Sequence, residues 1–259
     1  MQELLKEMHK WMNDYIKSFY SDDDEVQRGI LIKETHTGYV TSNCVELAKD
    51  LNFSQHDKDL AKIIGLFHDV GRFRQYSIYK TFNDAHSEDH ADLGVKVIEE
   101  LDFFKKLPAV DYEIVKFAIQ QHNKKNIAPN DDERKILFAK VIRDADKLDI
   151  YRVLEPFLAQ ENADKMPNFI KSTSNLIADV SPDFVENFVA GVQADFYKIR
   201  TNGDRKIVRL MWIYDINFAW TMKKILERGY IEKIVSNLPQ DKKIAEGVRR
   251  LKEYVKAKL

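Results

Sequence analysis

The chain has 259 residues, of which 44% are hydrophobic and 32% charged, so it can bury a sizeable core and wholesale disorder is excluded. Its 41 basic and 42 acidic residues leave a formal net charge of −1, which argues against dedicated nucleic-acid binding. The single cysteine, Cys44, excludes an internal disulfide and a cysteine-based zinc site. Since no apolar run approaches a membrane span and the N-terminus lacks a signal-peptide core, we expect no membrane partner and a cytoplasmic location.

Apolar residues recur at helical spacing along almost the whole chain, and 9 glycines and 6 prolines leave room for few turns. The first twenty residues predict one amphipathic helix. A second helix carries His36 on the same face as the apolar residues between Ile32 and Leu51. Ser54 can cap a third helix, which we expect to end near Val70-Gly71 because glycine suits a helix stop.

In residues 72–86 the apolar side chains follow no clean helical or strand spacing, so we predict a long loop there. Further helices are expected over 90–101, over 110–122 and from 136 towards 158, with a polar loop at 123–133. We expect a break at 162–167, a helix that starts at Ser181-Pro182, and two or three more helices split near Thr201–Asp204, Gly229 and Pro239.

The predicted fold class is therefore all-α. The simplest domain organisation is one all-α domain over 1–259, with a core at about 30–150 and a helical extension at about 160–259. A separate helical C-terminal subdomain is the alternative.

The segment around His68-Asp69 is the most informative for chemistry. It places adjacent imidazole and carboxylate groups beside Phe67 at the end of an apolar helix. Burying such groups is costly unless they are paired, and a divalent metal ion would pair with both. The similar dipeptide His56-Asp57 lies in a polar helix start, where capping already explains the aspartate.

Five short motifs occur in one order and together resemble the HD superfamily of metal-dependent phosphohydrolases, over about residues 30–150. The resemblance implies an HD-domain helical bundle with additional C-terminal helices. The motifs are His36-Thr-Gly-Tyr-Val40, Leu66-Phe-His-Asp-Val-Gly-Arg-Phe73, Asp89-His-Ala-Asp-Leu-Gly94, Gln120-Gln-His-Asn123 and Arg143-Asp-Ala-Asp-Lys-Leu-Asp149.

The resemblance also implies which residues bind metal. The ligands of a first ion correspond to His36, His68, Asp69 and Asp146. In members with two ions the extra histidines correspond to His90 and His122, and Asp69 would bridge. The alternative is that these two histidines are core residues satisfied by hydrogen bonds. The expected cofactor is one or two divalent ions, with Mn, Fe, Mg, Co, Ni and Zn all open.

Four residues are candidates for catalysis. Asp69 would order the ion that activates water, and Arg72 could hold a substrate phosphate, where some members have lysine. Lys147 could neutralise phosphate, and His86 could contact substrate or give a proton to the leaving group. The alternatives are a surface ion pair for Arg72, a solvated helix face for Lys147 and a loop histidine for His86. Asp144 and Asp149 are expected to be structural.

The expected function is hydrolysis of a phosphate ester or anhydride of a small metabolite, with a nucleotide favoured, by a metal-activated water. Two alternatives stay open: a di-iron oxygenase of the same superfamily, and a non-catalytic nucleotide-binding regulatory protein. The expected partner is a small phosphorylated substrate, and a homo-oligomer is possible.

Overall fold

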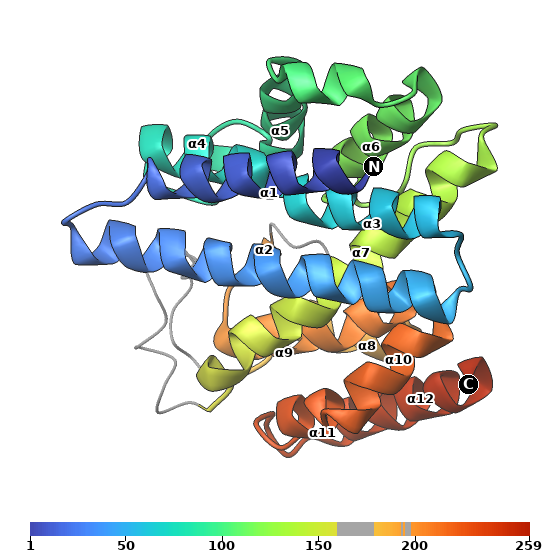
Figure 1. Ribbon diagram of the computed structural model, residues 1–259. Helices are drawn as coiled ribbons and strands as arrows, with labels where there is room; N and C mark the ends of the chain where they lie inside the picture. The colour runs from blue at the N-terminus through green and yellow to red at the C-terminus, as the bar shows by residue number, and fades with distance from the viewer. Residues whose placement is uncertain (160–178, 193, 195–197) are drawn as a thin grey trace. The chain divides into compact units, whose positions relative to one another are not determined.

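The structure is a computed structural model, and it describes residues 1–159, 179–192, 194 and 198–259 (Figure 1). These residues form helices and no β-strand, which confirms the all-α prediction. None of the described helices is long and apolar enough to cross a membrane. The contacts divide the chain into two compact units, Met1–Asp149 and Ile150–Leu259. The organisation as one domain stays a prediction.

Seven α-helices and two short 3₁₀ helices make up the described N-terminal unit, and the last α-helix runs on past its boundary. In chain order they are α1 (Gln2–Lys17), α2 (Asp24–Asp50), α3 (Gln55–Phe67), α4 (Val70–Tyr79), η1 (Asp84–His86), α5 (His90–Glu99), η2 (Asp102–Lys106), α6 (Ala109–Gln121) and α7 (Glu133–Leu154).

Side-chain caps stabilise two helix starts in this unit, and the one at Ser54 was predicted. The Asp23 carboxylate accepts a hydrogen bond from Val26 N at 2.9 Å and begins α2. The Ser54 hydroxyl accepts one from Asp57 N at 3.1 Å and begins α3. These local signals set the phase of the two helices that carry the first histidine motifs.

The expected helix end at Val70-Gly71 and the expected loop over 72–86 are both wrong. Helix α3 ends at Phe67, and α4 occupies Val70–Tyr79 with Val70, Phe73 and Tyr76 buried on one face. Gly71 is no stop signal: a Cβ there would lie 2.3 Å from the His90 carbonyl oxygen. The glycine lets α4 approach α5 closely, and the local spacing of apolar residues gives no sign of this contact.

The longest helix of this unit, α2, packs along α3 (Figure 1). Val40, Cys44 and Leu47 are fully buried on the inner face of α2, and His36 lies on the same face one turn earlier. The close approach is made possible by Gly65, since a Cβ on it would lie 2.8 Å from Thr41 Cα. The apolar stripe of α2 therefore directs a histidine into the interior.

The described part of the C-terminal unit contains more helices than the two or three expected after Ser181-Pro182. Its elements are η3 (Glu155–Phe157), α8 (Pro182–Ala190), α9 (Asn202–Met211), η6 (Trp212–Asp215), α10 (Ala219–Glu227), α11 (Tyr230–Val235) and α12 (Lys242–Lys258). The predicted start at Ser181-Pro182 and the splits near Thr201, Gly229 and Pro239 are confirmed. The extra break at 216–218 contains Asn217 but no glycine or proline, the strongest signals of a turn. The predicted break at 162–167 lies outside the described residues.

Candidate metal centre

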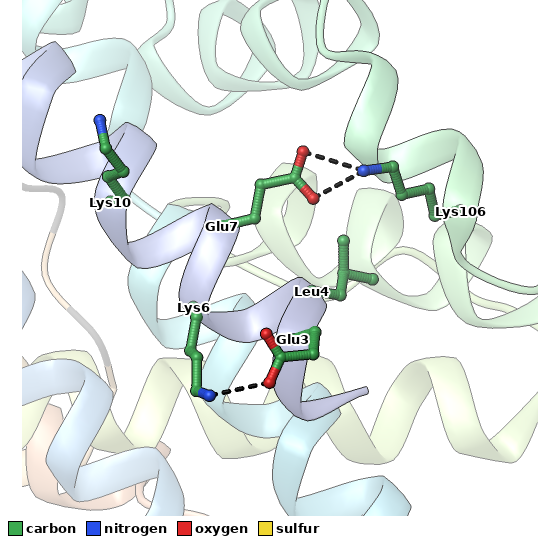
Figure 2. A pocket seen from close by; sticks show the side chains of 6 residues that line it. All are labelled: Glu3, Leu4, Lys6, Glu7, Lys10 and Lys106. Carbon is green, nitrogen blue, oxygen red and sulfur yellow. Dashed lines mark hydrogen bonds and ion pairs between the residues drawn. The ribbon is translucent and has the colours of Figure 1, made fainter.

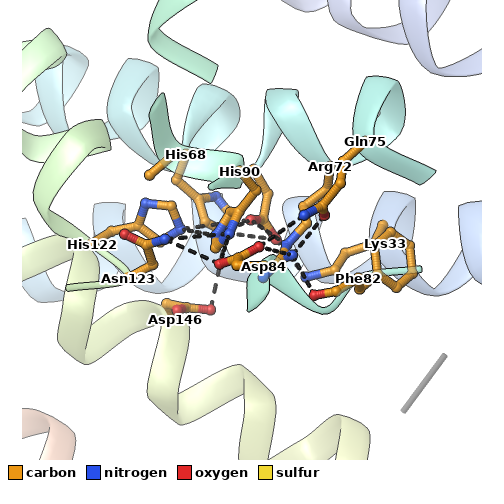
Figure 3. A network of polar contacts seen from close by, with 12 residues as sticks. Lys33, His68, Arg72, Gln75, Phe82, Asp84, His90, His122, Asn123 and Asp146 are labelled. Carbon is orange, nitrogen blue, oxygen red and sulfur yellow. Dashed lines mark hydrogen bonds and ion pairs between the residues drawn. The ribbon is translucent and has the colours of Figure 1, made fainter. Parts of the chain in front are cut away.

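The six histidine and aspartate residues expected to bind metal all lie in or beside helices of the N-terminal unit. They come from the middle of α2, the α3–α4 junction, the first residue of α5, the residue after α6 and the middle of α7. In the same order they are His36, His68 with Asp69, His90, His122 and Asp146. Figure 3 shows four of them, His68, His90, His122 and Asp146. Their side chains converge, although the chain between the first and the last of them is more than 100 residues long.

One group of donor atoms surrounds a single point. The Nε2 atoms of His36 and His68 are 3.3 Å apart and lie 3.5 and 3.4 Å from Asp69 Oδ2. Asp146 Oδ1 lies 3.1 Å from His36 Nε2 and 4.0 Å from His68 Nε2. Ligands held at about 2.0–2.2 Å from one ion have mutual separations of this size. These four side chains therefore fit a single divalent ion.

A second group shares the same aspartate. Asp69 Oδ1, the other carboxylate oxygen, lies 3.4 Å from His90 Nε2 and 3.6 Å from His122 Nε2. The two histidine nitrogens are 3.0 Å apart. Since each oxygen of Asp69 faces a different group, its carboxylate is placed to bridge two ions.

The hydrogen bonds at the other ring nitrogens favour a cation at both positions. Nδ1 of His68 lies 2.8 Å from the Gly65 carbonyl oxygen, and Nδ1 of His122 lies 2.6 Å from that of Ile119. A carbonyl only accepts, so both rings carry hydrogen on Nδ1, and in the neutral rings Nε2 keeps a lone pair. Lone pairs that face each other in a buried site repel unless a positive charge lies between them. The donor set thus fits a metal ion.

The pKa shifts point the same way. Burial lowers the pKa of His68, and it lowers that of His90 to about 3, so both rings are neutral at neutral pH. Burial and Lys33 also disfavour protonation of His36, but Asp146 and Asp149 outweigh them and raise its pKa. Burial opposes ionisation of Asp69, yet Lys33 and His68 hold its pKa well below the usual range. The centre therefore keeps its carboxylate ionised and attracts positive charge.

Two carboxylates orient the remaining histidines, and sequence reasoning missed both. Asp149 Oδ2 lies 2.6 Å from His36 Nδ1, and Asp84 Oδ2 lies 2.7 Å from His90 Nδ1. Such partners fix the ring orientation and make the opposite nitrogen a better ligand. Asp149 was expected to be structural, but its place one turn after Asp146 was an available signal. Asp84 was hidden in the expected loop.

Lys33 is a third residue that the sequence did not single out. Its Nζ lies 2.6 Å from Asp69 Oδ2, the oxygen that also faces His36 and His68. One turn of α2 separates Lys33 from His36, so the helical spacing could have pointed to it. Its side chain is 18% exposed, against 3% for His36, and so lies at the edge of the centre.

Arg72 lies beside the centre and is mostly buried, with 13% of its side chain exposed. Its Nη1 donates to Asp84 Oδ1 at 2.8 Å and to the Phe82 carbonyl at 2.6 Å, and its Nε is 3.7 Å from Asp69 Oδ1 (Figure 3). The Nε atom is buried without a hydrogen-bond partner. Arg72 thus forms an ion pair, as the alternative expects, but the pair with Asp84 is largely buried. A role in holding substrate stays a prediction.

The two other catalytic candidates lie close in sequence to residues of the centre, but their side chains belong to neither group of donor atoms. His86 is exposed at the end of η1, two residues after Asp84. Lys147 is half-buried on α7 beside Asp146. Their proposed contacts with substrate stay predictions.

Hydrogen bonds between elements hold the ligands in register. Asn43 Nδ2 on α2 donates to the Ala145 carbonyl on α7 at 3.1 Å, which links the helices of His36 and Asp146. The Arg143 guanidinium donates to the carbonyls of Gln121, at 3.1 Å, and Lys125, at 3.2 Å, and so holds the chain on both sides of His122. The arrangement of the centre is therefore built into the packing of α2, α6 and α7.

The structure also contains a shallow surface hollow of about 550 Å³ that includes none of these residues (Figure 2). Figure 2 shows two ion pairs among its charged side chains, Lys106 with Glu7 at 2.6 Å and Lys6 with Glu3 at 2.8 Å. The remaining lysine, Lys10, pairs with Asp14 at 2.6 Å. Exposed ion pairs of this kind contribute little, and they leave no free charge for a ligand.

Comparison with known proteins gives one family. The model of the HD domain matches residues 34–151, a range that contains all six candidate ligands. No curated protein and no solved structure matches the chain. The matched range, the helical fold and the converging histidines and aspartates agree with one another. The family match thus assigns residues 34–151 to the HD domain.

Proposed function

We propose that the protein is a metal-dependent phosphohydrolase that cleaves a phosphate ester or anhydride of a small metabolite. The convergence of four histidine Nε2 atoms on the two oxygens of Asp69 carries this proposal. His36, His68, Asp69 and Asp146 would hold one ion, and Asp69, His90 and His122 a second. A divalent ion supplies a water nucleophile at neutral pH by lowering the pKa of that water, and it polarises a phosphoryl oxygen.

The chain's own residues then have distinct tasks. The four histidines and the two aspartates orient the ions and keep bulk water away, since every histidine of the centre is 5% exposed or less. Asp149 and Asp84 keep two of the rings in the tautomer that offers Nε2. His86 would give a proton to the leaving group.

The more exposed edge of the centre supports an anionic substrate. Lys33, Arg72 and Asp146 are 13–18% exposed there, and the Phe82 ring lies between the two cations, 5.6 Å from Lys33 Nζ and 5.8 Å from Arg72 Cζ. When a metal takes up Asp69 Oδ2, the Lys33 ammonium is free to turn to a phosphate oxygen. Arg72 could bind phosphate through its unpaired Nε. Nucleotides are the first substrate class to test, and Lys147 would add a charge on the α7 side.

The test is metal analysis of the purified protein, followed by a panel of phosphorylated metabolites with Mn²⁺, Mg²⁺, Co²⁺ or Ni²⁺. We expect bound divalent metal and metal-dependent phosphate release, both lost in Asp69→Ala. Asp111→Ala is a matched control, because Asp111 is a buried carboxylate that pairs with His56 outside the centre. Hydrolysis that persists in Asp69→Ala would refute the proposal. Bound iron with an O₂-dependent reaction would instead identify an oxygenase.

A further inference from the structure

Gln75 is a buried polar residue to which the proposed reaction assigns no task. It lies on α4 three residues after Arg72, so the two side chains share one face of the helix. Gln75 is 0% exposed. A buried amide destabilises the fold unless its oxygen and its nitrogen both have hydrogen-bond partners. The partners of Gln75 therefore show which parts of the structure it holds together.

The two ends of the Gln75 amide bind different elements (Figure 3). Its Oε1 accepts a hydrogen bond from Arg72 Nη1 at 2.7 Å. Its Nε2 donates to Asp84 Oδ1, to Ser87 Oγ and to the Glu88 carbonyl, each at 2.8 Å. A guanidinium only donates, so the amide oxygen must face Arg72 and the amide nitrogen the acceptors. Gln75 thus joins α4 and Arg72 to the segment that leads into α5.

These contacts saturate one nitrogen of Arg72. Nη1 carries two hydrogens, and three acceptors surround it: Gln75 Oε1 at 2.7 Å, the Phe82 carbonyl at 2.6 Å and Asp84 Oδ1 at 2.8 Å. The Phe82 ring also lies over the guanidinium, with its centroid 5.8 Å from Cζ. Because the guanidinium is planar and rigid, fixing one nitrogen and one face fixes the direction of its other donors.

The other donors of Arg72 are left for a ligand. Nε is buried without a hydrogen-bond partner and lies 3.7 Å from Asp69 Oδ1, the oxygen that faces His90 and His122. Nη2 makes no hydrogen bond within the part of the chain that the structure describes. Nε and Nη2 form one edge of the guanidinium, and two parallel donors of this kind match two oxygens of a phosphate.

We propose that Gln75 is a positioning residue, which directs the Nε–Nη2 edge of Arg72 towards the substrate phosphate by holding Nη1. Without Gln75, Nη1 keeps two acceptors, and both lie in the segment between α4 and α5, which then loses its own tie to α4. The metal ligands should stay in place, because Asp84 holds His90 through Oδ2, the oxygen that Gln75 does not contact. This inference rests on the proposed function, which supplies the phosphate.

The test compares two affinities of the full-length protein: that for Mn²⁺, and that of the Mn²⁺-loaded protein for inorganic phosphate, both by calorimetric titration. Gln75→Met should bind phosphate about 10-fold more weakly, because a misdirected guanidinium loses much of its charge-assisted hydrogen bond. Its affinity for Mn²⁺ should stay near that of wild type. Gln27→Met, which removes an acceptor from Ser21 N on α2, is the matched control and should have both affinities of wild type.

A double-mutant cycle separates positioning of Arg72 from a general structural role. If Gln75 acts through Arg72, adding Gln75→Met to Arg72→Met should weaken phosphate binding no further. Gln75→Asn keeps a buried amide but is one methylene too short to span both partners, and it should show the loss of Gln75→Met. It carries the test if Gln75→Met does not fold.

Three results would overturn the inference while leaving the proposed function intact. They are phosphate binding by Gln75→Met that equals wild type, a further loss of the same size in the Arg72→Met background, and a parallel loss of Mn²⁺ affinity, which would indicate that the whole centre has loosened. A wild-type protein that binds no Mn²⁺ would instead overturn the proposed function, and this inference with it.

Discussion

Each histidine of the metal centre uses its two ring nitrogens for different purposes. Nε2 faces the centre, while Nδ1 is bound either to a backbone carbonyl, as in His68 and His122, or to a carboxylate, as in His36 and His90. The carboxylate partners add negative charge as well as orientation, so they should influence metal affinity more than a carbonyl does.

At the residue scale we predict that Asp149→Asn weakens metal binding by about 10- to 100-fold, because His36 loses its charged partner. The measurement is competition for Mn²⁺ against a chelating dye. Asp111→Asn removes the same kind of charge from His56, 2.7 Å away and outside the centre, and should bind Mn²⁺ as wild type does. Equal affinities of Asp149→Asn and wild type would mean that Asp149 has only a structural role.

At the scale of elements, the distance between α4 and α5 places Asp69 opposite His90. An alanine Cβ at position 71 would lie 2.3 Å from the His90 carbonyl oxygen and 2.6 Å from Gly94 N, both backbone atoms that cannot turn away. At position 94 the nearest atoms to such a Cβ are 3.5 Å away, an ordinary contact. An alanine should therefore clash with the backbone at position 71 but fit at position 94.

We therefore predict that Gly71→Ala lowers the free energy of unfolding by about 1–3 kcal/mol, because overpacking forces the helices apart. Metal affinity should fall as well, since Asp69 and His90 move away from each other. Gly94→Ala should leave both nearly unchanged or stabilise the helix slightly. Urea unfolding and metal titration of the two variants provide the comparison, and a Gly71→Ala protein as stable as wild type would contradict it.

The start of α3 is joined to α7 by an ion pair between Asp57 and Arg134. Burial alone would raise the pKa of Asp57, but hydrogen bonds from Arg134 and Ser54 outweigh it and lower the pKa below 3.8. A carboxylate with a lowered folded-state pKa stabilises the protein above its unfolded-state pKa, and this stabilisation is lost as the pH falls through the folded value.

We predict that Asp57→Asn costs up to about 1 kcal/mol of stability at pH 7, the usual size for a partly exposed pair. The difference from wild type should shrink below about pH 4 and vanish in stronger acid, because the wild-type carboxyl is then protonated. Denaturant unfolding of both proteins between pH 7 and pH 3 tests this. A stability difference that stays constant over the whole pH range would show that the charge of Asp57 does not contribute to it.

At the scale of the whole molecule, metal binding should stabilise the fold, because the donor groups exist together only in the folded chain. We predict that EDTA lowers the thermal midpoint of the wild-type protein. Free metal at 100 times its Kd corresponds to about 2.7 kcal/mol of stabilisation. Scanning calorimetry with Mn²⁺ and with EDTA should show this difference in wild type and not in Asp69→Ala. Identical curves for wild type under both conditions would argue against a metal site.

Sequence alone predicted those features that depend on neighbours in the chain. Apolar spacing indicated helices, the cap at Ser54 located the start of α3, and the order of the histidine motifs pointed to the family. Helix α4 escaped because Gly71 has the form of a local stop signal, although its purpose is a tertiary contact with α5. The further break at 216–218 escaped because no glycine or proline lies there.

Only the tertiary structure decided which groups support the centre. Asp149 meets His36 across 113 residues of chain, and Lys33 meets Asp69 across 36. Periodicity records which face of a helix is apolar, but a hydrogen bond or an unpaired charge depends on what packs against that face. That information lies in the packing of the helices and not in any local stretch of sequence.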